Sequence, residues 1–341
     1  GIAPIAAQLA DRFSRSLMMV IFHFGIGFSA ILTGLSDSIL QLTIGLGVIG
    51  IFAAIYHPVG IAMLVRSNKS IGFRLGVNGV FGNFGVAAAP LITGLLLTIG
   101  DWRLCFIIPG LFCLVYGLAF ARALKDTAES MNKSRVSAAE AFAPNWKRAL
   151  TALALSTASG GFIFGAMTFV VPRYFEISMV NLSTSVAVTG LLAALVYAVA
   201  SFSQIAVGWL IDRHSPKNIL LAMAIGQVVF IYLAAQFNDF ALFIAMLLAM
   251  SFVFGQIPIT DAILSRYVPD AWRARVFSVK FMLNLSIGAS VLPICGIILQ
   301  TGYSMTSLFT LMSAIAVLIV VAAIILPQQE SDQRLDHAPA E

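Results

Sequence analysis

Charged residues are scarce in this sequence, which limits what kind of protein it encodes. Only 10% of its 341 residues are Asp, Glu, Lys or Arg, against about 25% in an ordinary globular protein. So few charges cannot cover a water-facing surface, which excludes a soluble enzyme or a nucleic-acid-binding domain. Hydrophobic residues make up 60% of the chain, where a soluble domain has roughly 45–50%. The composition therefore predicts a protein whose solvent is lipid.

Cysteine is equally scarce, and sequence motifs for catalysis are missing. Cys105, Cys113 and Cys295 lie inside apolar runs without the spacing of a disulfide framework or a metal site, so we interpret them as packing residues. The sequence has no zinc-protease His-Glu-x-x-His, no Gly-x-Ser-x-Gly elbow and no phosphate-binding loop followed by Lys. We expect neither an enzyme nor a metal or other cofactor, and no nucleotide-binding domain to power primary transport.

Long uncharged runs predict ten complete membrane-spanning helices. A helix that crosses a bilayer needs about 20 residues with almost no charge. The last run is divided in two by the polar stretch Gln300-Thr301-Gly302-Tyr303-Ser304. Backbone groups in lipid must bond within their own element, and no run alternates like a barrel strand, so the fold class is an all-α polytopic bundle. The uncharged runs are 16–36, 38–65, 75–100, 104–121, 149–172, 177–211, 218–238, 240–260 and 281–329.

The Lys and Arg residues predict the orientation, because they concentrate on the cytoplasmic side of membrane proteins. If the turn holding Arg12 and Arg15 is cytoplasmic, only Arg103 and Arg173 of the twenty Lys and Arg residues fall on the other side. We therefore expect a multi-pass protein of the plasma (inner) membrane with both ends of this chain in the cytoplasm. The net charge of +5 reflects this topology and does not indicate nucleic-acid binding.

The longest polar stretch, Lys125 to Arg148, separates four spans from six. Its mixed charges, with Ala and Ser, suit a partly helical linker at the membrane surface. The stretch after Pro327 is short and polar, and we expect it to be a disordered tail. We accordingly expect an N-terminal bundle over 1–122, a cytoplasmic linker over 123–148, a C-terminal bundle over 149–326 and a cytoplasmic tail over 327–341.

An internal repeat relates the two predicted bundles. Two loops with Asp-Arg fall on the same side, so the repeats are parallel and related by an axis along the membrane normal. Residues 1–10 match 202–211, the end of a full span, and we therefore expect a twelve-helix protein of which the first helix and most of the second are missing here. At offsets of 200 to 203, Asp11-Arg12 recurs as Asp212-Arg213, Pro58 as Pro258, Arg66 as Arg266, Arg74 as Arg275, Pro90 as Pro293 and Gly94 as Gly296.

The repeated loop resembles a motif of the major facilitator superfamily of secondary transporters, Gly-x-x-x-Asp-Arg-x-Gly-Arg. The resemblance covers the whole chain and implies two six-helix bundles. It also implies that the loop is a gating motif, a latch between the bundles on the cytoplasmic side. A plain charged turn that caps two helix ends is the alternative; we favour the latch because the pair occurs twice. The gating residues are Asp11, Arg12, Arg15, Asp212, Arg213 and Lys217.

The fifth helix approaches a second motif of this family, which is associated with antiporters. Ala89 and Thr93 depart from it, and close helix packing through small residues is the alternative account. The Arg that begins the family's fourth-helix motif is replaced by Gln41. Within the family, Tyr56-His57-Pro58 and Gly82-Asn83-Phe84-Gly85 resemble the fosmidomycin-resistance group of drug exporters. The matching positions of the antiporter motif are Gly76, Gly85, Pro90 and Gly94.

A few polar residues within the helices are candidates for the substrate or proton pathway. His57 is a titratable group inside the fourth helix, although a neutral His bonded to a neighbouring helix is an equal alternative. Arg173, at the outer end of the seventh helix, could attract charged solutes, but pairing with Glu176 three residues later is the simpler account. The resemblance places the fourth, seventh and tenth helices around the cavity, which adds Ser156, Gln256, Thr260 and Asp261.

The sequence therefore predicts a secondary active transporter of a small solute that works by alternating access. The resemblance implies proton-coupled export of drugs or metabolites, and proton-coupled uptake of a small organic metabolite is the alternative. A non-transporting sensor or an intramembrane enzyme is a third, weaker alternative. We expect the protein to act as a monomer in the lipid bilayer, with a small-molecule substrate and protons as the coupling ion.

The predicted topology can be tested with a cysteine at Ser134, in the middle of the linker. In a variant without the three native cysteines, Ser134→Cys should resist an impermeant thiol reagent applied outside intact cells, because the linker is cytoplasmic. Permeabilised cells provide the control, since labelling should then be complete. Rapid labelling from outside would invert the whole topology.

Overall fold

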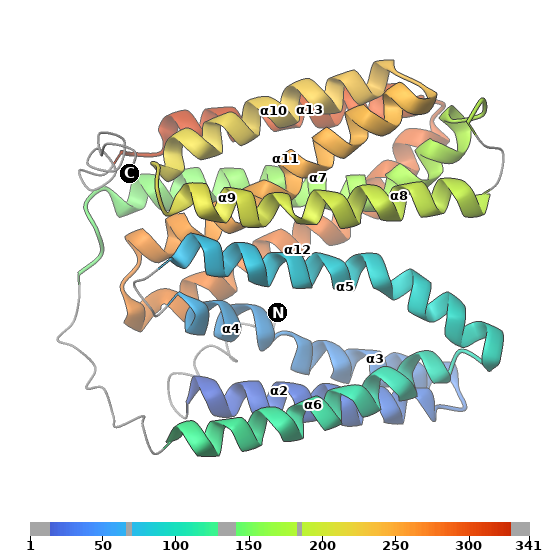
Figure 1. Cartoon of the computed structure of the whole chain (residues 1–341), viewed down its shortest axis with the longest axis vertical. Coiled ribbons are helices and arrows are strands. Elements are labelled where there is room, and N and C mark those ends of the chain that lie inside the picture. Colours follow the sequence, from blue (N-terminus) through green and yellow to red (C-terminus); the bar gives the residue numbers. More distant parts are fainter. Residues whose placement is uncertain (1–13, 66–69, 129–140, 183–185, 329–341) are drawn as a thin grey trace. The chain divides into compact units, whose positions relative to one another are not determined.

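The computed structural model describes residues 14–65, 70–128, 141–182 and 186–328, and the regular structure in those ranges is entirely helical (Figure 1). The predicted all-α fold class is therefore confirmed. Nine spans are long and apolar enough to cross a membrane within this described part. The helices are α2 (Arg15–Gly34), α3 (Ile39–Ala53), α4 (Tyr56–Leu64), α5 (Ile71–Ile99), α6 (Leu104–Ala128), α7 (Trp146–Ser178), α8 (Val186–Ser201), α9 (Ser203–Ile211), α10 (Pro216–Gln236), α11 (Asp239–Tyr267), α12 (Asp270–Gln300) and α13 (Met305–Ile325).

The helices begin where the sequence offers a polar side chain to the free N–H groups of the first turn. Ser14 accepts a hydrogen bond from the Leu17 N–H, at 3.0 Å. Ser304 does the same for the Ser307 N–H at 3.1 Å, which starts α13. Just before it, Gly302 has a φ of +90°, a conformation that glycine adopts without strain. The predicted division of the last uncharged run at this polar stretch is confirmed.

Two predicted spans are interrupted, which the uncharged runs did not indicate. The run 38–65 is two helices, α3 and α4, because Pro58 has no N–H to donate to the carbonyl of Ala54 and its ring crowds that carbonyl. The run 177–211 begins in the last turn of α7 and then contains α8 and α9, with a break at Phe202. Before this break the Ser201 hydroxyl donates to the Tyr197 carbonyl at 2.7 Å, a bond that bends helices.

The chain divides into two compact units, each built from more than one stretch of sequence. Unit one comprises Gly1–Arg66, Ala88–Ala141 and Pro269–Phe281. Unit two comprises Ser67–Ala87, Phe142–Val268 and Met282–Glu341. The first part of α5 therefore packs in unit two and the first part of α12 in unit one, so the units exchange segments relative to the sequence repeat.

In unit one, α2 lies along α6 and also contacts α3 and α4 (Figure 1). A small core forms where Met18 and Met19 of α2 meet Ile55 and Val59. His23 of α2 lies among aromatic rings, with centroids of Phe22 and Tyr116 at 4.8 and 4.9 Å, so its surroundings are those of a packing residue.

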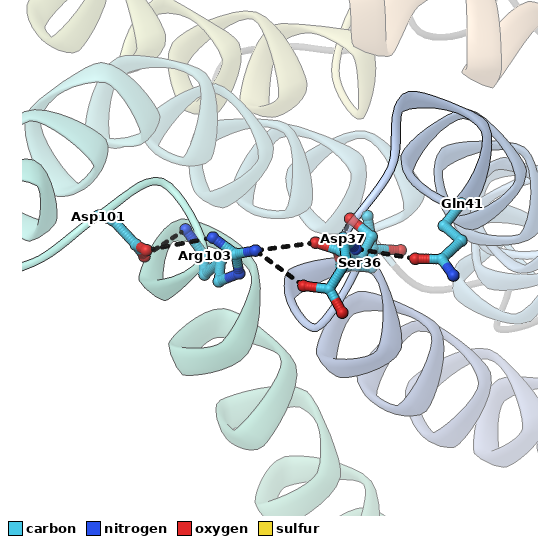
Figure 2. Close-up of polar contacts among 6 residues, drawn as sticks. Ser36, Asp37, Gln41, Asp101 and Arg103 are labelled. Carbon is cyan, nitrogen blue, oxygen red and sulfur yellow. Dashed lines mark hydrogen bonds and ion pairs between the residues drawn. The ribbon is translucent and has the colours of Figure 1, made fainter.

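Arg103 connects two loops at one end of unit one (Figure 2). Its guanidinium donates to the Ser36 carbonyl at 3.1 Å and forms ion pairs with Asp37 at 3.1 Å and Asp101 at 3.4 Å. Gln41 extends the cluster by accepting a hydrogen bond from the Asp37 N–H at 2.8 Å. Because both carboxylates are largely exposed, these pairs orient the loops and add little stability.

In unit two, α10 lies along α13, and α11 contacts α7, α8, α9 and α10 (Figure 1). Hydroxyl groups connect these helices by donating to main-chain carbonyls of their neighbours. The Tyr174 hydroxyl donates to Ala234 at 3.0 Å, and the Ser203 hydroxyl donates to Ser251 at 2.8 Å. Such bonds are worth about 0.6 kcal/mol each between membrane helices, so packing supplies most of the association.

Candidate functional site

Asp212 caps the first turn of α5. The first N–H groups of a helix have no acceptor inside the helix, and they carry partial positive charge. The Asp212 carboxylate, in the turn after α9, accepts hydrogen bonds from the N–H groups of Gly72 at 2.8 Å and Phe73 at 3.0 Å. A predicted gating residue of the second sequence repeat thus holds the start of a helix from the first repeat, and both lie in unit two.

Glycine brings the backbones of α5 and α9 into direct contact beside this cap. A methyl group at Gly72 would overlap the carbonyl of Gly208, and a methyl group at Gly76 would overlap the carbonyl of Gln204. By contrast, a methyl group at Gly82 or Gly85 would meet no described atom within 4 Å. Within the predicted helix-five motif, Gly76 therefore has a close-packing role that Gly85 does not share. We call the meeting of Gly72 and Gly76 with Gln204 and Gly208 the α5–α9 contact.

The other predicted gating residues of the second repeat bond to carbonyls at helix ends. The Arg213 guanidinium lies 4.1 Å from the centre of the Trp209 ring and donates to the Trp209 carbonyl at 3.3 Å. The Lys217 ammonium donates to the carbonyls of Ile324 at 3.1 Å and Leu326 at 2.7 Å, at the end of α13. A cation at a helix C-terminus is favourable because the last carbonyls lack partners within the helix.

Of the predicted gating residues of the first repeat, the structure describes Arg15. In unit one its guanidinium donates to the carboxylate and the carbonyl of Asp270, both at 3.2 Å, and to the Ala62 carbonyl at 3.4 Å. Asp270 begins α12, so Arg15 joins the starts of α2 and α12 to the end of α4. The other two gating residues, Asp11 and Arg12, lie outside the described residues.

A polar cavity of about 530 Å³ lies beside Asp212 in unit two. Arg266 borders it from the last turn of α11 and donates to the Ile211 carbonyl at 3.0 Å. The cavity is lined by Ser70, Ile71, Ile211, Asp212, Arg213, Ala262, Ser265 and Arg266.

Two of the predicted pathway residues, Gln256 and Ser156, bond to each other inside unit two. The Gln256 amide nitrogen donates to the Ser156 hydroxyl at 2.9 Å, and its amide oxygen accepts from Gln227 at 2.7 Å. These three residues belong to α11, α7 and α10, and all are buried. The amide chain therefore joins three helices.

Thr260 and Asp261, the next two candidates along α11, are 5% and 3% exposed. The Thr260 hydroxyl donates to the Ile257 carbonyl of its own helix at 2.9 Å. In this structure they are buried within unit two and directly precede Ala262, the first residue of α11 that lines the polar cavity.

The paired glycines Gly160 and Gly161 of α7 admit two amide side chains from neighbouring helices. A methyl group at Gly160 would lie 3.0 Å from the Gln256 amide nitrogen, and one at Gly161 would overlap the Asn284 amide oxygen of α12. The pair therefore has a close-packing role in α7. Asn284 is half-buried, whereas Ser156 of α7 and Gln256 of α11 are buried.

His57 is the second residue of α4, directly after the helix break. Its ring stacks on Phe281 of α12, with centroids 4.4 Å apart and planes inclined by 26°, and it meets Tyr56 edge-on at 5.4 Å. Lys280 lies 5.3 Å from the centre of the same Phe281 ring. A protonated His57 would therefore place its positive charge next to the Phe281 ring, which the Lys280 ammonium also approaches.

Arg173 forms an ion pair with Glu176 at 2.7 Å, which confirms the pairing expected from their spacing. Both side chains border a cavity of about 310 Å³ in unit two, together with apolar residues of α7, α8, α12 and α13. Pro90 and Gly94, the remaining candidates, lie in the second half of α5, and their surroundings are outside what the structure describes.

Three amides of this region were missed by sequence reasoning: Gln204, Gln227 and Asn284. Each lies in an apolar run, and an amide inside a bilayer needs a partner, so its presence alone was a usable signal. Within the described residues, no group of three or more His, Cys, Asp or Glu side chains could hold a metal ion.

Comparison with known proteins gives a family and a fold. The sequence model of the Major Facilitator Superfamily matches residues 2–183 and 177–340. The chain is 26% identical over 315 residues to the multidrug resistance protein MdtG of Yersinia enterocolitica, a match that covers 90% of this chain and 75% of that protein. A probable hexose phosphate transport protein of Chlamydia pneumoniae is 26% identical over 129 residues, which are 37% of this chain and 28% of that protein.

The fold is also similar to that of a solved transporter. The crystal structure of FucP in the outward conformation superimposes with a TM-score of 0.76, covering 96% of this chain and 87% of that one at 16% sequence identity.

The glycine contact predicts opposite effects for the same substitution at two positions of α5. Gly76→Ala should lower the thermal unfolding temperature of the purified protein, because overpacking typically costs about 1–3 kcal/mol. Gly82→Ala should leave it unchanged or raise it, because Ala is favoured over Gly in a helix by about 1 kcal/mol and open space surrounds this position. Equal behaviour of the two variants would contradict a backbone contact at Gly76.

Proposed function

Because the chain belongs to the Major Facilitator Superfamily, and is thus a multi-pass membrane transporter rather than an enzyme, we propose that it exports a small solute in exchange for protons. Alternating access would come from two bundles, residues 1–122 and 149–326, joined by the cytoplasmic linker 123–148. The inner membrane, cytoplasmic termini and a monomeric state belong to the same proposal. The relative called a multidrug resistance protein supports export. The second candidate is proton-coupled uptake of a small organic metabolite, and the relative named as a probable hexose phosphate transport protein supports a metabolite as the solute.

The cap of Asp212 on α5 carries the proposal of a latch. The bond joins a loop of the second repeat to a helix of the first, so a path between the bundles cannot open there until it breaks. Its strength suits this task, because an N-cap contributes about 0.5–2 kcal/mol, small enough for thermal opening and large enough to bias a two-state equilibrium. Asp11 is the residue of the first repeat that corresponds to Asp212. We therefore propose that it caps the start of α12, where Arg15 bonds to Asp270.

The substrate side of the proposal rests on Asn284 of α12, a half-buried amide in unit two. Asn284 offers an uncharged donor and acceptor, and it lies beside the buried amide chain of Ser156, Gln256 and Gln227. This chemistry suits the hydroxyl and amide groups of an uncharged or weakly charged organic solute. A strongly anionic substrate would instead require cations at this level, and the buried side chains around Gln256 supply none among the described residues.

Everted vesicles with an imposed pH gradient test the function directly. A panel of antibiotics and sugar phosphates is added one compound at a time, and proton movement is followed with a pH-sensitive fluorophore. Proton-coupled export predicts collapse of the gradient by an antibiotic. Collapse by sugar phosphates alone would favour the second candidate, and no response to any compound would contradict proton coupling for this panel.

Asp212→Ala should reduce flux while the protein still inserts into the membrane, because it removes both hydrogen bonds to α5 and the favourable charge at the helix start. A loss of about 1 kcal/mol changes the latch equilibrium roughly fivefold. Asp239→Ala is the matched control, since Asp239 also accepts a backbone hydrogen bond, from Asn181 at 3.0 Å, at a turn of unit two away from α5. Normal transport by the Asp212→Ala variant would contradict the proposed latch role of Asp212.

His57→Gln tests whether this histidine carries or senses the coupling proton, since an imidazole titrates in the physiological range and an amide does not. If it does, the variant should keep downhill exchange and lose accumulation driven by a pH gradient in everted vesicles. His23→Gln controls for the loss of a packed histidine in unit one. Intact proton-driven transport by His57→Gln would leave His57 as a packing residue on Phe281.

A further inference from the structure

The side chain of Gln204 is fully buried in the α5–α9 contact without a hydrogen bond. Its exposed fraction is 0%, and neither its amide nitrogen nor its amide oxygen has a partner among the described residues. The amide occupies the space that a side chain at Gly79 would need, so the absence of a Cβ at Gly79 creates the slot. An unpaired buried amide costs free energy because its hydrogen bonds to water are lost and nothing replaces them.

A second unpaired amide lies one helical turn further along α5. Asn83 is 6% exposed, its amide nitrogen has no described partner, and it shares a helix face with Gly79, four residues earlier. The first part of α5 therefore carries one buried, unsatisfied amide nitrogen of its own and also packs against the unsatisfied amide of Gln204.

The other buried glutamines of unit two are treated differently. The Gln227 amide nitrogen donates to Gln256 at 2.7 Å and to the Phe252 carbonyl at 3.3 Å. Gln256 in turn donates to Ser156. Both of these glutamines thus hydrogen-bond to neighbouring helices, with only the Gln227 amide oxygen lacking a described partner, whereas Gln204 makes no hydrogen bond with any described residue where the proposed latch opens.

We propose that Gln204 is a positioning residue of the transport cycle, which keeps the closed α5–α9 contact weak enough to open. The glycines allow close packing and the Asp212 cap favours closure, while the unpaired Gln204 amide opposes it. When α5 leaves α9, water or a polar solute satisfies the amide, so the cost exists only in the closed contact. This inference rests on the proposed alternating access, because only a contact that opens during the cycle is served by such a residue.

The test replaces Gln204 with methionine, which has similar length and no amide. In a variant without native cysteines, Leu75→Cys reports opening, because Leu75 is 3% exposed on the α5 face that carries Gly72 and Gly79. Gln204→Met should slow cytoplasmic thiol labelling at this position about tenfold. The free-energy cost of one unsatisfied buried polar group corresponds to about a factor of ten in the opening equilibrium, and the methionine removes that cost from the closed contact. It should also raise the thermal unfolding temperature and lower the maximal transport rate, with the KM unchanged.

Gln227→Met provides the matched control with the opposite sign, because it removes paired hydrogen bonds and should lower the unfolding temperature. A lower unfolding temperature for Gln204→Met as well would overturn the proposal, since the amide would then have a stabilising partner. Stabilisation with unchanged labelling and transport would overturn it too, because the contact would not open in the cycle. Labelling and unfolding are measured without any solute, so both are independent of the vesicle assay. If the unmodified protein fails in the vesicle assay, that result counts against the proposed function. The labelling and unfolding results then still decide the role of Gln204.

Discussion

The need to satisfy every backbone hydrogen-bonding group inside lipid constrains this structure more than any other requirement. It makes the helix the only regular element available to the described residues, and it concentrates polar chemistry at the places where helices start, stop or break. Asp212 and Lys217 both act there, one on the free N–H groups of α5 and the other on the free carbonyls of α13. Two residues of the predicted gating motif of the second repeat, Asp212 and Lys217, are therefore helix caps whose partners come from distant parts of the sequence.

In a bilayer, burying an apolar side chain against another helix gains little over leaving it in contact with lipid, because lipid tails are as apolar as leucine. Helices then associate through close backbone approach and through hydroxyl or amide groups. Unit two uses both means. Gly160 and Gly161 admit the amides of Gln256 and Asn284, and the hydroxyls of Tyr174 and Ser203 reach carbonyls of adjacent helices. The polar residues of the apolar runs are thus mainly connections between helices, and only some remain accessible to a solute.

Sequence reasoning predicted those parts that depend on local composition. The all-helical fold, the interruption at residues 300–304 and the pairing of Arg173 with Glu176 follow from charge spacing and turn residues, and all three are observed. The breaks at Ile55 and Phe202 were missed, although Pro58 was a local signal for the first of them. The partners of Asp212, Gln204 and Gln256 could not be predicted, because they depend on which helices meet, and nearly uniform apolar runs carry little information about that.

The same limitation explains why the exchange of segments between the units was not foreseen. The repeat in the sequence divides the chain near the linker, yet the first part of α5 packs with α9 and the first part of α12 packs with α2 and α4. A transporter needs a contact between its repeats that is close enough to exclude solute and weak enough to separate. At the α5–α9 contact, glycine provides the closeness and Asp212 adds a bond that water can replace, while the unpaired amide of Gln204 limits the depth of the closed state. In the proposed cycle, reversibility comes from combining good packing with the unsatisfied amide of Gln204, and neither feature alone would produce it.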